Sequence, residues 1–304
     1  MAGLIKEVWR KEILGGLYMN NEFLKWCVNA SPYVKDGTIV HIPQAGIPSN
    51  VEVDRTSLPA TVTERTDSDV VYTLKEFTSD PKLIRNIDTI QLSYDKMQSV
   101  ISEDMATLRE QVANWMLRLW TPADAAAIIR TTGDAVVAKA PAATGNRKAI
   151  TLDDFANAQL TLDNQSVPQE GRKAIIPANM MAPLLVDIDL LKRDAGGELN
   201  IKDGRIARLF GFDIVTRPKV NVYTNAGTPV AKNPGVAGAV TDNLAGLFWH
   251  PQYVEGAVGS IEPFYKLNDP TYYGDIFSFL VMAGGRIRRA DNKGVLTLVE
   301  DAAA

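Results

Sequence analysis

The sequence predicts an α+β fold, because strand-like and helix-like segments follow one another without the regular alternation that builds a parallel sheet. Residues 69–77 are dense in β-branched residues and place Val70, Tyr72 and Leu74 on one face, which predicts a strand. Residues 86–120 carry apolar residues at steps of three and four, which predicts one long amphipathic helix. The chain has 304 residues, enough for one large domain or two ordinary ones.

The first 33 residues are predicted to form an N-terminal arm. Apolar residues such as Leu17, Phe23 and Trp26 occur throughout it without one clean helical period. Gly15 and Gly16 divide the arm into two short helical pieces at most. The arm therefore carries apolar surface without an evident place to bury it.

The next segment, residues 34–80, predicts a long two-stranded ribbon. Residues 37–43, 60–65 and 69–77 have the strand pattern, and a stretch rich in Pro, Gly, Ser and Asn follows the first of them. A two-stranded ribbon is marginal alone because it buries too little apolar surface. It must therefore lie on the core of its own chain or on a neighbouring copy.

The helix predicted over residues 86–120 would be about 50 Å long at 1.5 Å per residue. Thr121 and Pro122 end it inside a globular sequence. A coiled-coil strand is the alternative, but we favour a helix packed across a sheet because the stripe is short for a free coiled coil. The stripe consists of Ile87, Ile90, Tyr94, Met97, Ile101, Met105, Leu108, Val112, Met116 and Leu119.

The rest of the chain predicts short strands and helices. Thr151 and Asp154 have the spacing of a capping box that begins a helix through Asp163. The other predicted elements are strands over 173–176 and 244–249, helices over 178–191 and 251–257, a strand on each side of a glycine pivot within 204–218, and two strands within 276–298 joined around Gly284 and Gly285.

Composition excludes several classes of function. A net charge of −4 and a pI of about 5.4 exclude a strong polyanion binder. The single cysteine, Cys27, excludes an internal disulfide and a cysteine-rich metal site. The N-terminus lacks the apolar region of a signal peptide, and residues 276–283 are too short to span a bilayer. We therefore expect a soluble cytosolic protein without a membrane partner.

The sequence contains none of the nucleotide-binding, metalloprotease, nucleophile-elbow or redox motifs, so we expect no enzyme, cofactor or metal site. His41 and His250 are interpreted as strand-end or turn residues, because the sequence shows no orienting carboxylate beside either. A hydrolase that uses one of them remains the enzyme alternative. Asp67 and Asp69 are interpreted as a solvated turn rather than a cation site.

Three arginines near the C-terminus, Arg286, Arg288 and Arg289, raise the alternatives of a nucleic-acid contact, a membrane-edge anchor or the exposed end of a buried strand. Asp291 follows them, and no aromatic residues are interleaved at base-stacking spacing. We interpret them as interface charge that pairs with acids of a neighbouring copy.

The order of these elements resembles the major capsid protein of tailed double-stranded-DNA bacteriophages, whose Hong-Kong-97-type fold is shared by encapsulin compartments. Short strings also resemble this family. Lys173–Met180 (KAIIPANM) resembles a strand and helix of its axial domain, Arg208–Pro218 its glycine–aromatic strand pair, and Ala245–Phe248 and Tyr272–Ile287 its closing strands.

The resemblance implies a division of the chain. It implies an N-terminal arm over 1–33 and an extended β-hairpin loop, the E-loop, over 34–80. A peripheral domain over 81–129 would include the spine helix 86–120. Residues 130–259 would be mostly axial domain, and residues 260–304 would return to the peripheral domain as strands.

The resemblance also implies a function. Hexamers and pentamers would assemble into an icosahedral head in the host cytoplasm and remain in the virion, enclosing double-stranded DNA without sequence-specific binding. The implied partners are other copies of the chain, a portal, and separate scaffolding or decoration proteins. Alternatives are an encapsulin-type shell, a tail structural subunit, or a hydrolase using His41 or His250.

The residues expected at inter-subunit interfaces are those whose apolar or charged surface has no predicted partner within the chain. They are Leu17, Phe23, Trp26, Val70, Tyr72, Leu74, Arg286, Arg288 and Arg289.

Overall fold

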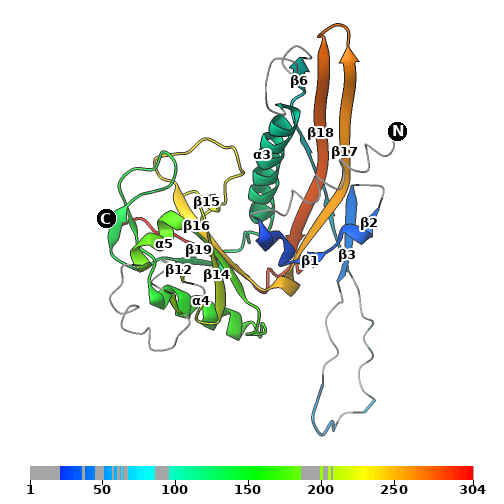
Figure 1. Cartoon of the computed structure of the whole chain (residues 1–304). Helices are drawn as coiled ribbons and strands as arrows, with labels where there is room; N and C mark the ends of the chain where they lie inside the picture. Colours follow the sequence, from blue (N-terminus) through cyan, green and yellow to red (C-terminus); the bar gives the residue numbers. More distant parts are fainter. Residues whose placement is uncertain are drawn as a thin grey trace.

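The computed structural model has two bodies, each built around one β-sheet (Figure 1). It describes residues 21–35, 38–44, 51–56, 58, 59, 62, 64, 68–85, 96–185, 199, 200, 205, 206 and 208–303. Leu17, Asp67 and the expected helical residues 86–95 lie outside these ranges. Among the described helices, none has the length and apolar character needed to cross a membrane.

The first body is a five-stranded sheet dominated by two long antiparallel strands. These strands, β17 (Val254–Asp269) and β18 (Gly274–Ile287), extend away from the rest of the molecule as a ribbon (Figure 1). Three short strands complete the sheet. β1 (Val28–Asn29) pairs with β17, while β5 (Lys75–Thr78) and β6 (Lys82–Arg85) pair with β18.

The long helix α3 (Lys96–Leu119) covers this sheet with the apolar stripe that the sequence predicts. Met105, Leu108, Val112 and Met116 are buried in one core with side chains of β17 and β18. Burying such a stripe stabilises a helix more than its intrinsic propensity does. The prediction is confirmed for the described part of the helix.

The second body is a seven-stranded sheet with α4 (Leu152–Asn164) and α5 (Ala178–Leu185) packed on one face. Along its strands, alternate side chains point to opposite faces. Ile176 and Phe248 pack under the helices, while Ile175 and Trp249 join the core of the first body. The two bodies therefore share one buried junction. The strands are β7 (Ile128–Arg130), β10 (Lys173–Pro177), β13 (Arg208–Leu209), β14 (Phe212–Arg217), β15 (Asn221–Tyr223), β16 (Asn243–Trp249) and β19 (Val295–Val299).

Two local predictions in this body are confirmed. Thr151 and Asp154 form the predicted capping box, in which each side chain accepts a hydrogen bond from the backbone amide of the other residue. The predicted glycine pivot is a two-residue turn, with Phe210 at φ 46° and Gly211 at φ 77°. Positive φ at both central positions is what a tight hairpin between twisted strands requires.

A third unit is the small sheet of β2 (Val34–Lys35), β3 (Ile39–Gln44) and β4 (Ser68–Thr73). The sequence predicts one strand over 69–77, but the structure interrupts it at Leu74. β4 pairs with β3, whereas β5 pairs with β18. Leu74 is buried against Ala30, Val40 and Ala257, and this packing accompanies the change of partner. β8 (Ala135–Val137) with β9 (Asn146–Lys148), and β11 (Leu199–Asn200) with β12 (Arg205–Ile206), form the remaining pairs.

Two predictions near the C-terminus are wrong. Residues 251–257 are not one helix, because Pro251–Tyr253 is a single 3₁₀ turn and β17 begins at Val254. Gly284 and Gly285 do not bend the chain, because β18 runs through both. A Cβ atom on Gly285 would lie 2.5 Å from the Glu255 oxygen and 2.9 Å from Trp120 Nε1. The glycine therefore permits close packing of helix and strand.

The expected grouping of residues 260–304 also differs from the structure. β18 belongs to the first sheet, but β19 pairs with β16 and β7 in the second. Between them, Asn292 and Gly294 adopt positive φ and redirect the chain. The expected boundary at residue 259 likewise falls inside β17 rather than between elements.

Candidate assembly surface

The segment between β3 and β4 exposes the apolar side chains that the structure describes there. Val51, Val53, Leu58 and Val62 are 81–96% exposed. Single exposed apolar residues are ordinary on a protein surface, but four of them between two neighbouring strands indicate a contact surface. We call Val51, Val53, Leu58 and Val62 the exposed loop residues.

A second exposed apolar group lies at the far end of the β17–β18 ribbon (Figure 1). Phe264, Leu267, Tyr272 and Tyr273 are about half exposed or more. The resemblance places Tyr272 in a closing strand, and that placement is wrong because the chain turns there, with Asn268 and Tyr273 at positive φ. The Asn268-Asp269-Pro270 string is the turn signal that could have located this tip.

The two described arm residues with expected interface roles contact their own chain. Phe23 is only 3% exposed, with its ring edge against Trp120 at a centroid distance of 6.1 Å. The assignment of Phe23 to an inter-subunit surface is therefore wrong, because its side chain is buried in the core of its own subunit. Trp26 is half-buried against Trp249, at 6.5 Å between ring centroids.

The ribbon residues divide in a similar way. Val70 and Leu74 are buried within the subunit, so the prediction that they face a neighbour is wrong. They alternate along the chain with exposed residues, and the sequence alone does not say which face finds a partner. Tyr72 is half-buried, and its hydroxyl donates to the Glu255 carboxylate at 3.3 Å.

The C-terminal arginines have partners within the chain. Arg288 Nε lies 3.3 Å from the Glu255 carboxylate, and Arg289 pairs with Asp291 at 2.7 Å. Arg286 is exposed and donates to the Val71 backbone oxygen at 3.2 Å. The expectation that these arginines pair with acids of a neighbouring copy is therefore corrected for Arg288 and Arg289, and an interface role for Arg286 stays a prediction.

The histidines of the enzyme alternative have different surroundings. His41 lies beside Asp69, with 2.5 Å between Nδ1 and the carboxylate, so the structure supplies a carboxylate that the sequence did not reveal. Both groups are about half exposed on the β3–β4 ribbon. His250 caps the 3₁₀ turn by accepting from the Gln252 amide, and its Nε2 faces the Glu170 oxygen at 3.1 Å. Backbone groups thus occupy both His250 nitrogens.

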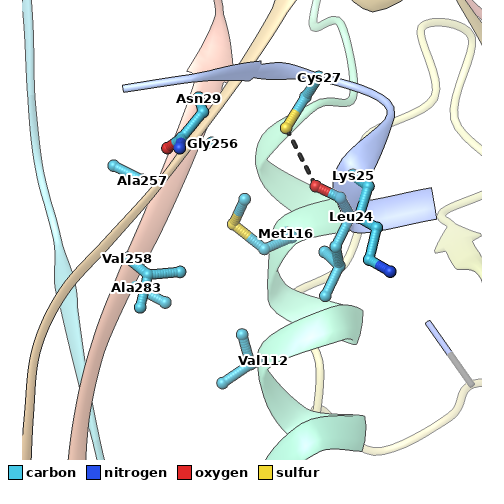
Figure 2. A pocket seen from close by; sticks show the side chains of 10 residues that line it. All are labelled: Leu24, Lys25, Cys27, Asn29, Val112, Met116, Gly256, Ala257, Val258 and Ala283. Atoms are coloured by element: carbon cyan, nitrogen blue, oxygen red, sulfur yellow. Dashed lines mark hydrogen bonds between the residues drawn. The ribbon is translucent and has the colours of Figure 1, made fainter. Parts of the chain in front are cut away.

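A cavity of about 250 Å³ lies between the N-terminal segment, α3 and the long strands, and Figure 2 shows its lining. Cys27 borders it, and its thiol donates to the Leu24 oxygen at 3.2 Å. Burial, and secondarily the nearby Glu255 charge, raises the pKa of Cys27 to about 12, so the thiol stays protonated at neutral pH. Across the described ranges, no cluster of three His, Cys, Asp or Glu side chains suited to a metal ion occurs.

No family model matches the sequence, and no curated protein matches it. Solved structures do match the fold. A capsid chain of Ralstonia phage GP4 is 11% identical, with a TM-score of 0.65 over 92% of this chain and 88% of that one. A capsid chain of the cyanophage P-SCSP1u is 19% identical, with a TM-score of 0.64 over 91% and 86%.

A third similar structure is a virus-like particle from Pyrococcus furiosus. Its chain is 12% identical, with a TM-score of 0.55 over 97% of this chain and 99% of that one. At such low identities the likeness concerns the fold, and it extends over nearly the whole of each chain. The protein therefore has the Hong-Kong-97-type capsid fold.

Proposed function

We propose that this chain is the major capsid protein of a tailed bacteriophage and forms its icosahedral head. The observation that carries the proposal is the overlap with two phage capsid chains across nearly their whole length. A partial overlap would fit a shared module, whereas overlap from end to end fits a shared architecture. Fold alone does not fix function, so the surface of the chain supplies the second argument.

The surface suits self-assembly because it exposes two groups of apolar residues outside the packed cores. The exposed loop residues form one group, and the other belongs to the β17–β18 ribbon, which extends away from its body (Figure 1). Apolar surface of this kind becomes useful when a neighbouring copy covers it. Closed rotational symmetry lets one chain use the same contacts repeatedly, as hexamers and pentamers of a shell require.

We propose a division of the chain that is based on its sheets. We assign the E-loop to β3, β4 and the segment between them, and the arm to residues before β1. The peripheral domain comprises α3 and the sheet of β17 and β18. The axial domain comprises the seven-stranded sheet with α4 and α5, and it includes β19.

The enclosed material is proposed to be double-stranded DNA held without sequence-specific contacts. A net charge of −4 suits DNA that must be packed and later released. A portal and separate scaffolding or decoration proteins are the further partners of such a head. The role is structural, in the virion, after assembly in the host cytoplasm.

A second candidate is a nanocompartment shell around a protein cargo, which the likeness to the virus-like particle favours. The two functions differ in contents. Particles sedimented from the native source are treated with nuclease, and their DNA and protein are then analysed. Protected DNA of uniform length supports the phage head. A second, unrelated protein inside DNA-free shells would replace it with the compartment.

A further inference from the structure

The carboxylate of Glu255 is buried where the β3–β4 ribbon meets the long strands. Its residue is 4% exposed, on β17. One carboxylate oxygen accepts from the Tyr72 hydroxyl of β4, and the other lies 3.3 Å from Arg288 Nε just beyond β18. The Glu255 backbone oxygen accepts from Trp120 Nε1 at 2.9 Å, which fixes the residue against the end of α3. Glu255 thus links the ribbon to the main body.

One end of the β3–β4 ribbon is anchored by its backbone, because β4 is followed directly by Leu74 and by β5, which pairs with β18. Few other side-chain contacts hold the base of the ribbon. A small cluster buries Val40 and Leu74 against Ala30 and Ala257. Arg286 adds one hydrogen bond to the Val71 oxygen from an exposed side chain. Because this apolar cluster is small, the polar link between Tyr72 and Glu255 is a substantial part of the side-chain contacts that position the ribbon against the body.

Glu255 is the acidic group that Tyr72 and Arg288 contact at this junction. Burial raises its pKa above the ordinary value of 4.5, against the lowering effects of Arg288 and Tyr72. Burial also raises the pKa values of Tyr72 and Cys27, so both remain neutral. The basic groups at the junction are Arg288 and Arg286, and Arg286 occupies the position of β18 that pairs with Glu255.

We propose that Glu255 is a proton-controlled latch that holds the base of the β3–β4 ribbon against the body when charged and, when protonated, releases it to pivot about the anchored Leu74. Hydrogen bonds to an ionised acceptor are roughly twice as strong as those between neutral groups. Protonation also removes the ion pair with Arg288, whose side chain is 40% exposed and also donates to the Gln252 backbone oxygen at 3.2 Å. The latch rests on the proposed function, because it would set the position of the ribbon that contacts a neighbouring subunit.

Fluorine NMR on the unassembled subunit tests the latch. The protein is labelled with 3-fluorotyrosine, and the Tyr72 resonance is identified by its loss in Tyr72→Phe. Lowering the pH from about 8 should shift this resonance with a midpoint above that of an ordinary glutamate. Glu255→Gln, which mimics the protonated state, should show the acid position at every pH. Glu262→Gln, on the same strand outside the junction, should titrate as the wild type does.

Spin-label distances test the movement itself. Labels at Val71→Cys and Leu267→Cys, in a Cys27→Ser background, should give one narrow distance at neutral pH and a broader distribution in acid. At neutral pH, Glu255→Gln should raise the population of the released state about tenfold and so broaden the distance distribution. A Tyr72 resonance that ignores pH, or a Glu255→Gln protein that titrates like the wild type, would overturn the latch. Both measurements use unassembled subunits. Either of these results would therefore overturn the latch without contradicting the proposed shell function. If the protein failed to form shells, the latch could still be tested in the same way.

Discussion

Trp249 Nε1 donates a 2.9 Å hydrogen bond to the backbone oxygen of Trp26, joining the end of β16 to the N-terminal segment. Trp249 is fully buried, and its ring lies 6.0 Å from that of Trp120 at the end of α3. One side chain of the second sheet therefore contacts both the end of α3 and the N-terminal segment. The two bodies and the arm residues after Asn21 are held together at this point.

Trp249→Phe should destabilise the subunit by about 2 kcal/mol, because it leaves the Trp26 oxygen without its donor and opens a small cavity. Urea unfolding measures the change. Trp115→Phe is the matched control, since Trp115 Nε1 has no hydrogen-bond partner among the described residues. Equal losses in the two variants would contradict a role for the Trp249 hydrogen bond.

Gly285→Ala should cost about 1–3 kcal/mol, because the added methyl group meets the Glu255 oxygen and the Trp120 indole. Thermal unfolding of the variant checks this. Gly227→Ala serves as control, since a Cβ there meets no atom within 4 Å. If Gly285→Ala were as stable as the wild type, the helix would not pack as closely on β18 as the structure has it.

His250→Asn should remove one component of the pH dependence of stability. Burial lowers the pKa of His250 below its ordinary 6.5, and Arg172 lowers it further despite the bond to Glu170. The unfolded chain then binds the proton more readily, so stability falls as the pH drops below 6.5 through the folded pKa. Asparagine retains the turn cap without titrating.

The measurement for His250 is the free energy of unfolding of wild type minus variant, from neutral pH downwards. This difference should fall as the pH decreases. His41→Asn, on the exposed ribbon, should preserve the decline that His250 causes. A difference that is constant with pH would show that His250 is protonated equally readily in both states.

Local features were predictable from the sequence, because their causes lie within a few residues. The stripe of α3, the Thr151 capping box and the Phe210–Gly211 turn each depend on spacing along the chain. Gly285 was misread as a bend because its requirement comes from Trp120 and Glu255, which only the folded chain brings near it. The membership of β19 in the second sheet likewise depends on a long-range pairing with β16.

The segments that form the candidate surface could be predicted from the sequence, but the individual residues that are exposed on it could not. The expected ribbon does carry exposed apolar side chains, at Val53 and Val62 among others. Phe23 and Leu74 were assigned outward because the sequence does not show the buried sites that receive them. The Arg288–Glu255 pair joins a residue of β17 to one just beyond β18, and charge alone could not distinguish it from an inter-subunit pair.

Replacing Val51, Val53 and Val62 with Asn should leave subunit stability within about 0.5 kcal/mol, since all three side chains are exposed. Assembly should fail or need at least about tenfold more protein, because the contact surface is lost. Light scattering during assembly measures this. Leu160→Asn, an exposed change on α4, is the control. Unfolding of the triple variant would instead place these valines in the core of their own subunit.

Electron microscopy of the purified protein, across a range of salt and protein concentrations, tests the proposed function most directly. Closed icosahedral shells, or rings of five and six subunits, are the predicted result. A strictly monomeric protein under every condition, by microscopy and by sedimentation, would contradict the proposal that this chain builds a shell.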